Sequence, residues 1–512
     1  MEFTSLDLKL PTFSELRAQQ AAAERTRALQ RRQSALMQRR FDAAMNNRFT
    51  SDWVAPVTSA GAELRQGLRT MRARSRDLAH NDGYMKKFLS MVRSNVIGPR
   101  GIRVQARAKT NGDELDSVLN RQVEDAWQRW CHKDTCTVSG KLSWLDVQNL
   151  AATQLARDGE CLIRKVTAKN DFGFALKLID VSYLSETNNQ LLPNGNRILM
   201  SVEVDNDDRP VAYHLTTPYY DHLYPESGRV NKTVRVPASE IIHLFVCQED
   251  ETVTRGVPWT HAAMRNLRDL GEFIEAKVIG ARVEACQMAF LIPPGGQEAQ
   301  FTGADPLPVE VEASPGIFPQ LPAGYDIKNF DPKHPNGNEG EFLKTMLKGI
   351  AVGFDVDYCT FASDLREVNY SSIRAGIQET REVWKVCQQF FIEHLHREVY
   401  LSWLRSAMLT GALEGVLPRD VDRLTEPKFL PRGWGYVNPQ QDAEADEKRV
   451  ANGFTTTTQV LADEGEDFEE MLVVKSEEIK LQTKYGVKVG PAPKAATEPA
   501  DANQPADENA GK

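Results

Sequence analysis

The feature that most constrains the fold is a long helical stretch, from about Ser371 to Leu409, that follows a polar segment rich in aromatic residues. An almost unbroken helix of this length would extend roughly 58 Å at 1.5 Å per residue. The preceding segment, Tyr358–Tyr370, is too polar to be buried between helices and should project into solvent or against a ligand. We therefore expect a predominantly helical α+β protein with an exposed loop at the start of its longest helix.

Two further helices, 258–288 and 338–356, flank residues 289–337, which hold many of the prolines and several glycines of the chain. This order predicts a stalk with a strand-and-loop tip, and Pro258 should lie near the start of the first helix. In the second helix Lys344 and Lys348 fall on one side. Within an arc of about 140° on the other side lie the apolar residues Phe342, Leu343, Met346, Leu347, Ile350 and Phe354.

The residues before this stalk predict helices and then strands. Residues 14–48 have helix composition, and two further helices should break at Asn81–Asp82–Gly83. A helix over 113–130 would bring Trp127 and Trp130 into the core. The following strands are expected in the hairpins "GECLIRKVTA"/"FALKLIDVSYL" and "RILMSVEVDNDDRPVAYHLTT", and in the single strand "VRVPASEIIHLFV".

The two ends of the chain differ in charge. The net charge is −9, yet residues 1–110 carry 21 Lys/Arg against 9 Asp/Glu, whereas residues 440–512 are acidic. This asymmetry suggests different partners at the two ends, and for the basic end either nucleic-acid contact or a solvated helix surface. Beyond Gly453 the pattern predicts short acidic helices, one of them capped within Thr455–Thr458, and the last residues have the composition of a disordered tail.

Signals for export, membrane insertion and covalent chemistry are missing. The start lacks the features of a signal peptide, and no window approaches the roughly 18 apolar residues of a membrane span, so we expect a cytosolic product without membrane association. The seven cysteines are scattered and expected to be reduced. Cys131, His132 and Cys136 could form half of a zinc site, but no second ligand pair follows. His394 and His396 are two residues apart on a helix and cannot pair as ligands.

The common sequence motifs of enzymes are missing as well. The sequence contains no P-loop, no H-E-x-x-H, no nucleophile elbow and no dinucleotide-binding glycine pattern. We therefore expect no catalytic residues, no metal and no cofactor. An ATPase or nuclease remains an alternative that the missing motifs disfavour and that an ATPase assay would test.

Nine segments in a fixed order resemble the lambda-type portal proteins of tailed bacteriophages, over about residues 60–485. They are "RARSRDLAHNDGYMKKFLSMVRSNVIGPRGI", "DGECLIRK", "RPVAYHL", "VPASEIIHLF", "RGVPW", "LPAGYDI", "KGIAVGFDVDY", "NYSSIRAG" and "GFTTTTQVLADEGEDFEE". The first 50 and last 25 residues match nothing in that family, and "YCTFASDLREV" is only loosely similar to its loop.

The resemblance implies the phage portal fold, a ring-forming subunit with wing, stem, clip and crown, usually in a dodecamer at one capsid vertex. Its parts would be a basic N-terminal segment (1–50), wing (51–257 and 371–439), stem helices (258–288 and 338–356), clip (289–337), tunnel loop (357–370), crown (440–485) and disordered tail (486–512). The alternative within phage particles is another neck or collar adaptor subunit.

The resemblance also implies partners and sites. Double-stranded DNA would pass through the ring without sequence-specific contacts during packaging and ejection, and the terminase large subunit, a head-tail adaptor and the capsid or scaffolding protein would bind the ring in the virion or, during assembly, in the host cytoplasm. The channel candidates are Lys344, Lys348, Ser363, Asp364, Arg366, Asn369 and Tyr370. The docking candidates in the clip are Phe318, Leu321, Tyr325, Asp326 and Lys328.

Overall fold

The chain divides into two compact units, Met1–Ser59 and Ala60–Lys512. The computed structural model describes residues 25, 58–110, 114–216, 233–247, 250–285, 289–292, 326–329, 339–366, 370–416, 420–435 and 438–486. Apart from Arg25, which is helical, the predicted helix 14–48 lies outside the described residues, as does the predicted tail. Everything below concerns the second unit.

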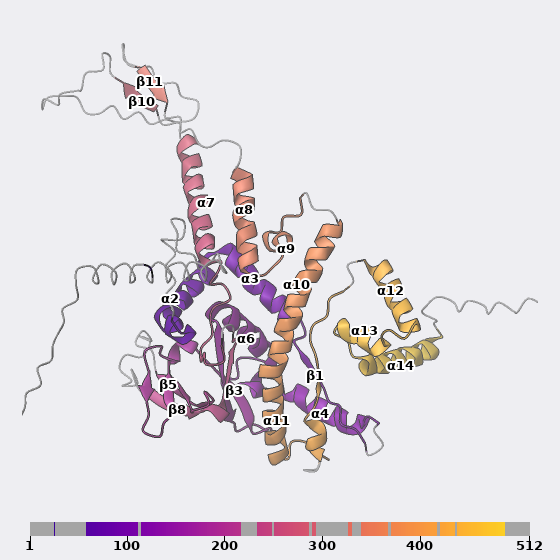
Figure 1. The fold of residues 1–512 in the computed structure, drawn as a ribbon. Helices are drawn as coiled ribbons and strands as arrows, with labels where there is room; N and C mark the ends of the chain where they lie inside the picture. Colours follow the sequence, from indigo (N-terminus) through magenta and orange to yellow (C-terminus); the bar gives the residue numbers. More distant parts are fainter. Residues whose placement is uncertain are drawn as a thin grey trace, which may run out of the picture. The chain divides into compact units, whose positions relative to one another are not determined.

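This unit is mostly helical with four small sheets (Figure 1). Its main helices are α2 (Ala60–Asn81), α3 (Gly83–Val92), α4 (Ser117–Trp130), α5 (Lys133–Cys136), α6 (Trp144–Asp158), α7 (Met264–Ala285), α8 (Glu339–Gly353), α9 (Tyr358–Ala362), α10 (Tyr370–Phe391), α11 (Arg397–Leu409), α12 (Pro439–Ala451), α13 (Thr457–Asp463) and α14 (Phe468–Tyr485). Within the described residues, no helix is long and apolar enough to cross a membrane.

The strands pair antiparallel throughout. The sheets have the strand orders β4-β5-β6-β7-β8, β3-β2-β9, β1-β12 and β10-β11. The strands are β1 (Arg103–Gln105), β2 (Glu160–Thr167), β3 (Phe174–Ile179), β4 (Gln190–Leu191), β5 (Arg197–Leu199), β6 (Val202–Val204), β7 (Pro210–Thr216), β8 (Thr233–Pro237), β9 (Ile241–Phe245), β10 (Ala289–Ile292), β11 (Asp326–Asn329) and β12 (Lys428–Leu430).

The longest predicted helix is confirmed. Helices α10 and α11 follow one another without interruption, joined by one wide turn of π-helix, Ile392–His396 (Figure 1). His396 is buried in that turn, and its Nδ1 lies 2.9 Å from the carbonyl oxygen of Phe391. The break between α2 and α3 is also confirmed, since the Asp82 side chain accepts a hydrogen bond from the Met85 amide and caps α3.

Two strand predictions were wrong. The segment predicted as one strand from Arg197 to Val204 is two strands, because Met200 and Ser201 have positive φ values of 46° and 71° and turn the chain. The Met200 amide is held there by the side chain of Asn189, at 3.0 Å. Likewise "VRVPASEIIHLFV" is not one strand, since a 3-10 turn (Ala238–Glu240) sends β8 and β9 into different sheets.

The start of the first stalk helix was also predicted too early. Helix α7 begins at Met264 rather than near Pro258, because the chain before it is held by other elements. The Trp259 amide donates to the carbonyl oxygen of Ala156, and the hydroxyls of Thr260 and Ser75 lie 3.0 Å apart. Tertiary contacts thus override the helix-start signal of a proline.

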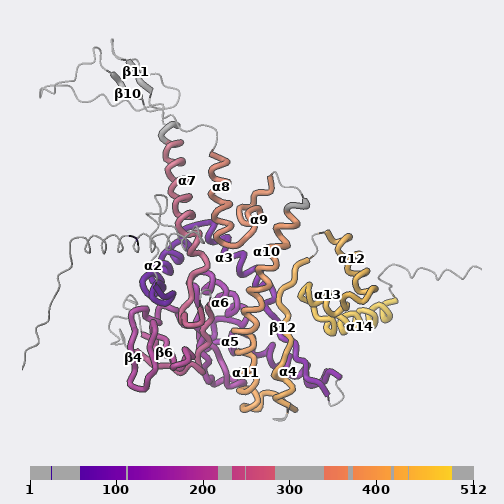
Figure 2. Tube along the Cα trace, viewed as in Figure 1, coloured from indigo at the N-terminus to yellow at the C-terminus, as the bar shows by residue number. Residues whose placement is uncertain are grey.

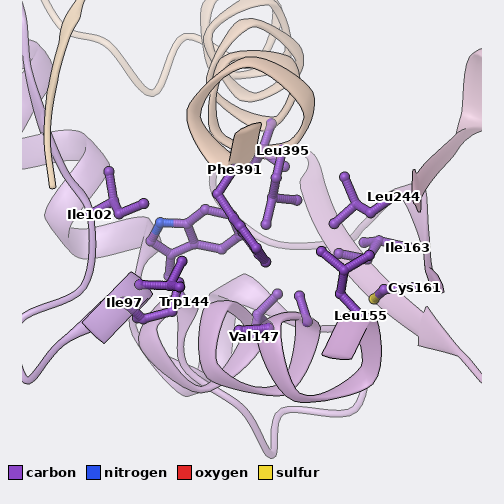
Figure 3. Close-up of a cluster of buried hydrophobic side chains, with 14 of the residues drawn as sticks. Ile97, Ile102, Trp144, Val147, Leu155, Cys161, Ile163, Leu244, Phe391 and Leu395 are labelled. Carbon is purple, nitrogen blue, oxygen red and sulfur yellow. The ribbon is translucent and has the colours of Figure 1, made fainter. Parts of the chain in front are cut away.

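The core combines aromatic side chains from α4, α6 and α11 with apolar residues of the small sheets. Figure 3 shows a part of it, in which Trp144 of α6 and Phe391 of α10 lie in one cluster with Ile163 and Leu244 of a small sheet. The predicted helix carrying Trp127 and Trp130 is confirmed as α4, and both side chains are buried. The ring of Trp127 lies 5.0 Å from that of Trp403 in an edge-to-face arrangement, a geometry that favours aromatic packing.

A fully buried carboxylate connects the sheets to the chain entering α7. Glu160, at the start of β2, accepts hydrogen bonds from the guanidinium groups of Arg72 and Arg255, and its Oε2 lies 2.9 Å from His243 Nε2. Arg255 is itself fully buried and also donates to the carbonyl oxygens of Leu184 and Met200. Segments far apart in sequence therefore meet at one charged centre.

The helix cap predicted within Thr455–Thr458 is confirmed. The side chain of Thr456 accepts a hydrogen bond from the Gln459 amide at the start of α13. Ion pairs Arg100–Glu466 and Arg103–Glu470 connect the start of α14 to the region of β1.

Candidate functional site

Helices α7 and α8 lie side by side and form the predicted stalk (Figure 2). The rings of Phe273 and Phe342 are 5.0 Å apart, and Lys277 forms an ion pair with Glu339 across the two helices. At the other end of α8, Ile350 and Phe354 are buried, as their position on the apolar side predicts. Phe342, predicted on the same side, is 47% exposed even though it contacts Phe273.

Both stalk helices also carry exposed apolar residues. In α7, Ile274, Val278 and Ile279 are 38%, 45% and 52% exposed, and in α8 Val352 is 79% exposed. Sequence reasoning did not single out the three residues of α7, whose i, i+4, i+5 spacing places them within an arc of about 140° on the helix surface. An exposed apolar strip along a stalk favours association with another protein surface.

The polar segment after α8 is anchored at its first half, contrary to the expectation that it projects freely. Helix α9 forms within it, capped by Asp357, whose side chain accepts a hydrogen bond from the Thr360 amide at 2.8 Å. Phe361 is buried, with its ring 5.5 Å from Phe354 and 5.7 Å from Tyr84. The contacts of this one buried aromatic hold the loop against α3 and the end of α8. The polar composition of the segment gave no indication of this anchoring.

The second half of the segment gathers its predicted charges around Tyr358. The Tyr358 hydroxyl donates to Asp364 at 3.1 Å, and Arg366 Nε donates to the same carboxylate at 3.2 Å. Lys348 Nζ lies 5.8 Å from the centre of the Tyr358 ring. Burial and Asp364 raise the pKa of Tyr358, while the charge of Lys344 acts in the opposite direction, which places Lys344 in the same cluster.

This cluster is open to solvent and nearly neutral. The Arg366 side chain is 89% exposed, and its hydrogen bond lowers the pKa of Asp364. Near Tyr358 and Cys359 the cations Lys344, Lys348 and Arg366 stand against the carboxylates Asp357 and Asp364, a net charge of +1. Ser363, in the left-handed conformation with φ of 54°, ends α9 and turns the chain toward the cluster. Such a surface can touch phosphates only weakly, because the number of phosphates neutralised dominates affinity.

The remaining predicted site residues are less completely described. Asn369 lies outside the described residues, and Tyr370 begins α10 with its side chain not described. In the insert, the described backbone forms a two-stranded hairpin in which Asp326 pairs with Ile292 and Lys328 with Phe290. The other docking candidates, Phe318, Leu321 and Tyr325, lie outside the described residues.

Among the described residues, no group of three or more His, Cys, Asp or Glu side chains could hold a metal ion. Cys131 and Cys136 are free thiols whose pKa values are raised by burial.

Comparison with known proteins identifies the family. The profile of the phage portal protein, lambda family, matches residues 46–388. The probable portal protein of Halomonas phage phiHAP-1 is 33% identical over 426 residues, which cover 82% of this chain and 81% of that protein. Portal protein B of Escherichia phage lambda is 20% identical over 391 residues, covering 70% and 72% of the two chains. The chain belongs to the lambda family of phage portal proteins.

Solved structures of gene transfer agent (GTA) particles also match. A chain from the virion of a native GTA particle aligns with a TM-score of 0.42 at 13% identity, covering 79% of this chain and 99% of that one. A chain from the neck of a native GTA particle, computed with C12 symmetry, aligns with a TM-score of 0.40 at 12% identity, covering 78% and 98%.

Proposed function

We propose that this portal protein forms a closed ring at one vertex of a phage capsid, and that double-stranded DNA passes through the ring during packaging and ejection. In this proposal α7 and α8 belong to the stem segments 258–288 and 338–356. Residues 51–257 and 371–439 form the wing, and residues 440–485 form the crown. Family membership supports the portal role, and the stalk supports the ring.

The observation that carries the ring proposal is the exposed apolar strip of Ile274, Val278 and Ile279 on α7. A strip of this kind, repeated in every copy, closes a ring when it packs against a different surface of the next copy. Mass photometry of the purified chain at micromolar concentration, at several salt concentrations, tests the proposal. A single large species with a central pore in negative-stain images is expected, whereas a stable monomer or dimer would contradict it.

The tunnel loop, residues 357–370, is proposed to face the DNA, together with Lys344 and Lys348 of the stem. Its near-neutral, exposed cluster suits a channel through which DNA must slide, because tight phosphate binding would stop movement. The Arg366 side chain is 89% exposed and is therefore able to reach a phosphate.

Two substitutions separate the channel role of this loop from its structural role. Arg366→Glu should leave the melting temperature nearly unchanged, since exposed loop substitutions have small effects, but it should reduce DNA packaging by adding a ring of negative charge. Phe361→Ala should instead lower the free energy of unfolding by about 3–5 kcal/mol, because it empties a buried aromatic site. Melting curves and packaged DNA are measured on both variants. A loss of packaging in Arg366→Glu that is fully explained by lost stability would contradict the channel role.

The insert 289–337 is proposed as the clip that docks the terminase motor and later the head-tail adaptor. Deleting it should leave a folded ring, because the stalk contacts Phe273–Phe342 and Lys277–Glu339 are outside it. The deletion should abolish binding of the packaging motor in a pull-down with assembled rings. Packaging at the wild-type level by the deletion variant would show that the motor docks elsewhere.

A further inference from the structure

A groove of about 850 Å³ lies among β1, α4, the start of α6 and the start of α14. It shares no residue with the stalk or the tunnel loop. Among the residues that line it are Val104, Val118, Arg121, Glu124, Trp144 and Val473.

One wall of the groove is the edge of β1 that faces away from β12, where side chains already bond the amides on either side of Val104. Within the described residues β1 pairs only with β12, in a two-stranded sheet. The amides of Ile102 and Ala106 point away from β12, because they donate to the side chains of Gln148 (2.9 Å) and Glu124 (2.7 Å), which line the groove. Alternate residues of a strand turn their amides to the same edge, so Val104 presents its N–H and C=O to the groove. Val104 therefore offers one backbone donor and one backbone acceptor to an extended ligand, the kind of main-chain contact that extended peptides use.

A buried donor points to a missing acceptor in the same groove. Trp144 is 3% exposed, and its indole Nε1 has no hydrogen-bond partner among the described residues. Figure 3 shows this nitrogen on the side of Ile102, which also lines the groove. A buried donor without a partner is costly, and a carbonyl oxygen of a bound backbone would satisfy it.

The charges of the groove favour a basic ligand. Arg100 and Arg103 are already paired with Glu466 and Glu470. The wall charges without an ion-pair partner in the described part of the chain are Arg121, Glu124, Asp125, Asp467 and Glu469. One cation against four carboxylates leaves a net charge of −3 when all four carboxylates are ionised.

Glu124 is affected first by its burial and then by this excess of negative charge. Burial, together with the charges of Asp467, Glu469 and Asp125, raises its pKa to about 7 although it accepts the Ala106 amide. The other charged or titratable groups near it are Arg121 on α4, Arg103 on β1, Glu470 on α14 and Tyr400 on α11.

We propose that this groove binds an extended segment of a partner protein, in which lysine or arginine alternates with apolar residues, held on β1 by main-chain hydrogen bonds to Val104. The apolar side chains of the segment would contact Val118 and Val473, which are 68% and 49% exposed. Its cations would face Glu124, Asp125, Asp467 and Glu469. The site goes beyond the proposed DNA channel and clip, and it assigns the wing and crown their own binding surface.

The acetylated and amidated peptide Lys-Val-Lys-Val-Lys is a suitable probe, titrated into the assembled protein at fixed ionic strength and followed by tryptophan fluorescence. The charge-reversed peptide Glu-Val-Glu-Val-Glu should bind at least tenfold more weakly. Only one edge of the bound peptide faces β1, so only one set of its amides can bond there. N-methylation of that set, either the valines or the lysines, should abolish binding, and N-methylation of the other set should leave it unchanged. Equal binding of the two charge forms, or the same result for both methylated peptides, would overturn the proposal.

Protein variants provide the matched comparison. Glu469→Gln should weaken binding several-fold, whereas Glu414→Gln, at an exposed position outside the groove, should not change it. Affinity should rise between pH 6 and pH 8 as Glu124 ionises while the lysines stay charged, and Glu124→Gln should remove this dependence. Unchanged affinity in Glu469→Gln, or an unchanged pH profile in Glu124→Gln, would count against the groove as the binding site.

Discussion

Replacing Glu160 with Gln is expected to lower the free energy of unfolding by about 3–5 kcal/mol, the usual cost of removing one partner from a buried ion pair. Glu160 and Arg255 are both fully buried, and Arg72 is nearly so. The amide of Gln would leave two guanidinium charges in the interior without a compensating carboxylate. Chemical denaturation of the wild type and the variant measures the difference.

The exposed pair Arg164–Glu240 provides the control, because Glu240→Gln breaks an ion pair whose side chains are 38% and 40% exposed. Surface pairs of this kind contribute at most about 1 kcal/mol.

Burial would raise the pKa of Glu160, but Arg255 and Arg72 outweigh it and hold the pKa well below its usual range. A depressed pKa gives stability that is present at neutral pH and is lost only as the pH falls through the folded value. If Glu160→Gln and Glu240→Gln lowered the free energy of unfolding equally, burial of the ion pair would not be the cause of the loss.

Replacing Val278 and Ile279 together with Glu is expected to abolish ring formation while leaving the single chain folded. Both side chains are about half exposed in the single chain, so the substitution removes little intrachain packing. In a ring, each carboxylate would have to be buried against the neighbouring stem without a partner, which costs several kcal/mol per group and is repeated in every subunit. Mass photometry should show monomers, and circular dichroism should show an unchanged melting curve.

Leu191→Glu is a suitable comparison, because Leu191 is 77% exposed on the short strand β4, away from the stalk. It should assemble as the wild type does. A double Glu variant that still forms rings would show that this strip of α7 faces solvent in the assembly.

Elements defined by local signals were predictable from the sequence, and elements defined by distant contacts were not. The helix break at Asp82 and the cap at Thr456 depend on side chains bonding within three residues. In contrast, the turn at Met200–Ser201 depends on Asn189, and the delayed start of α7 depends on Ala156 and Ser75. Hydrophobic periodicity carries no information about such partners.

The same distinction applies to the sites. The charges of residues 357–370 could be identified because they stand close together in the sequence, but the burial of Phe361 depends on Tyr84, which is far away in the chain. The groove on β1 could not be predicted at all, since its walls combine residues near 104 and near 470.

The π-helical turn at Ile392–His396 changes the geometry of the longest helix. A π turn holds one residue more than an α turn, so it offsets the angular phase of everything after it relative to everything before it. Arg374 of α10 pairs with Asp442, and Tyr400 and Trp403 of α11 are buried in the aromatic core. The π turn between them sets the direction of one face relative to the other. The wide turn holds one residue more than a regular α-helix would at this point, so removing one residue from it would restore the regular helix without changing the face that either half presents.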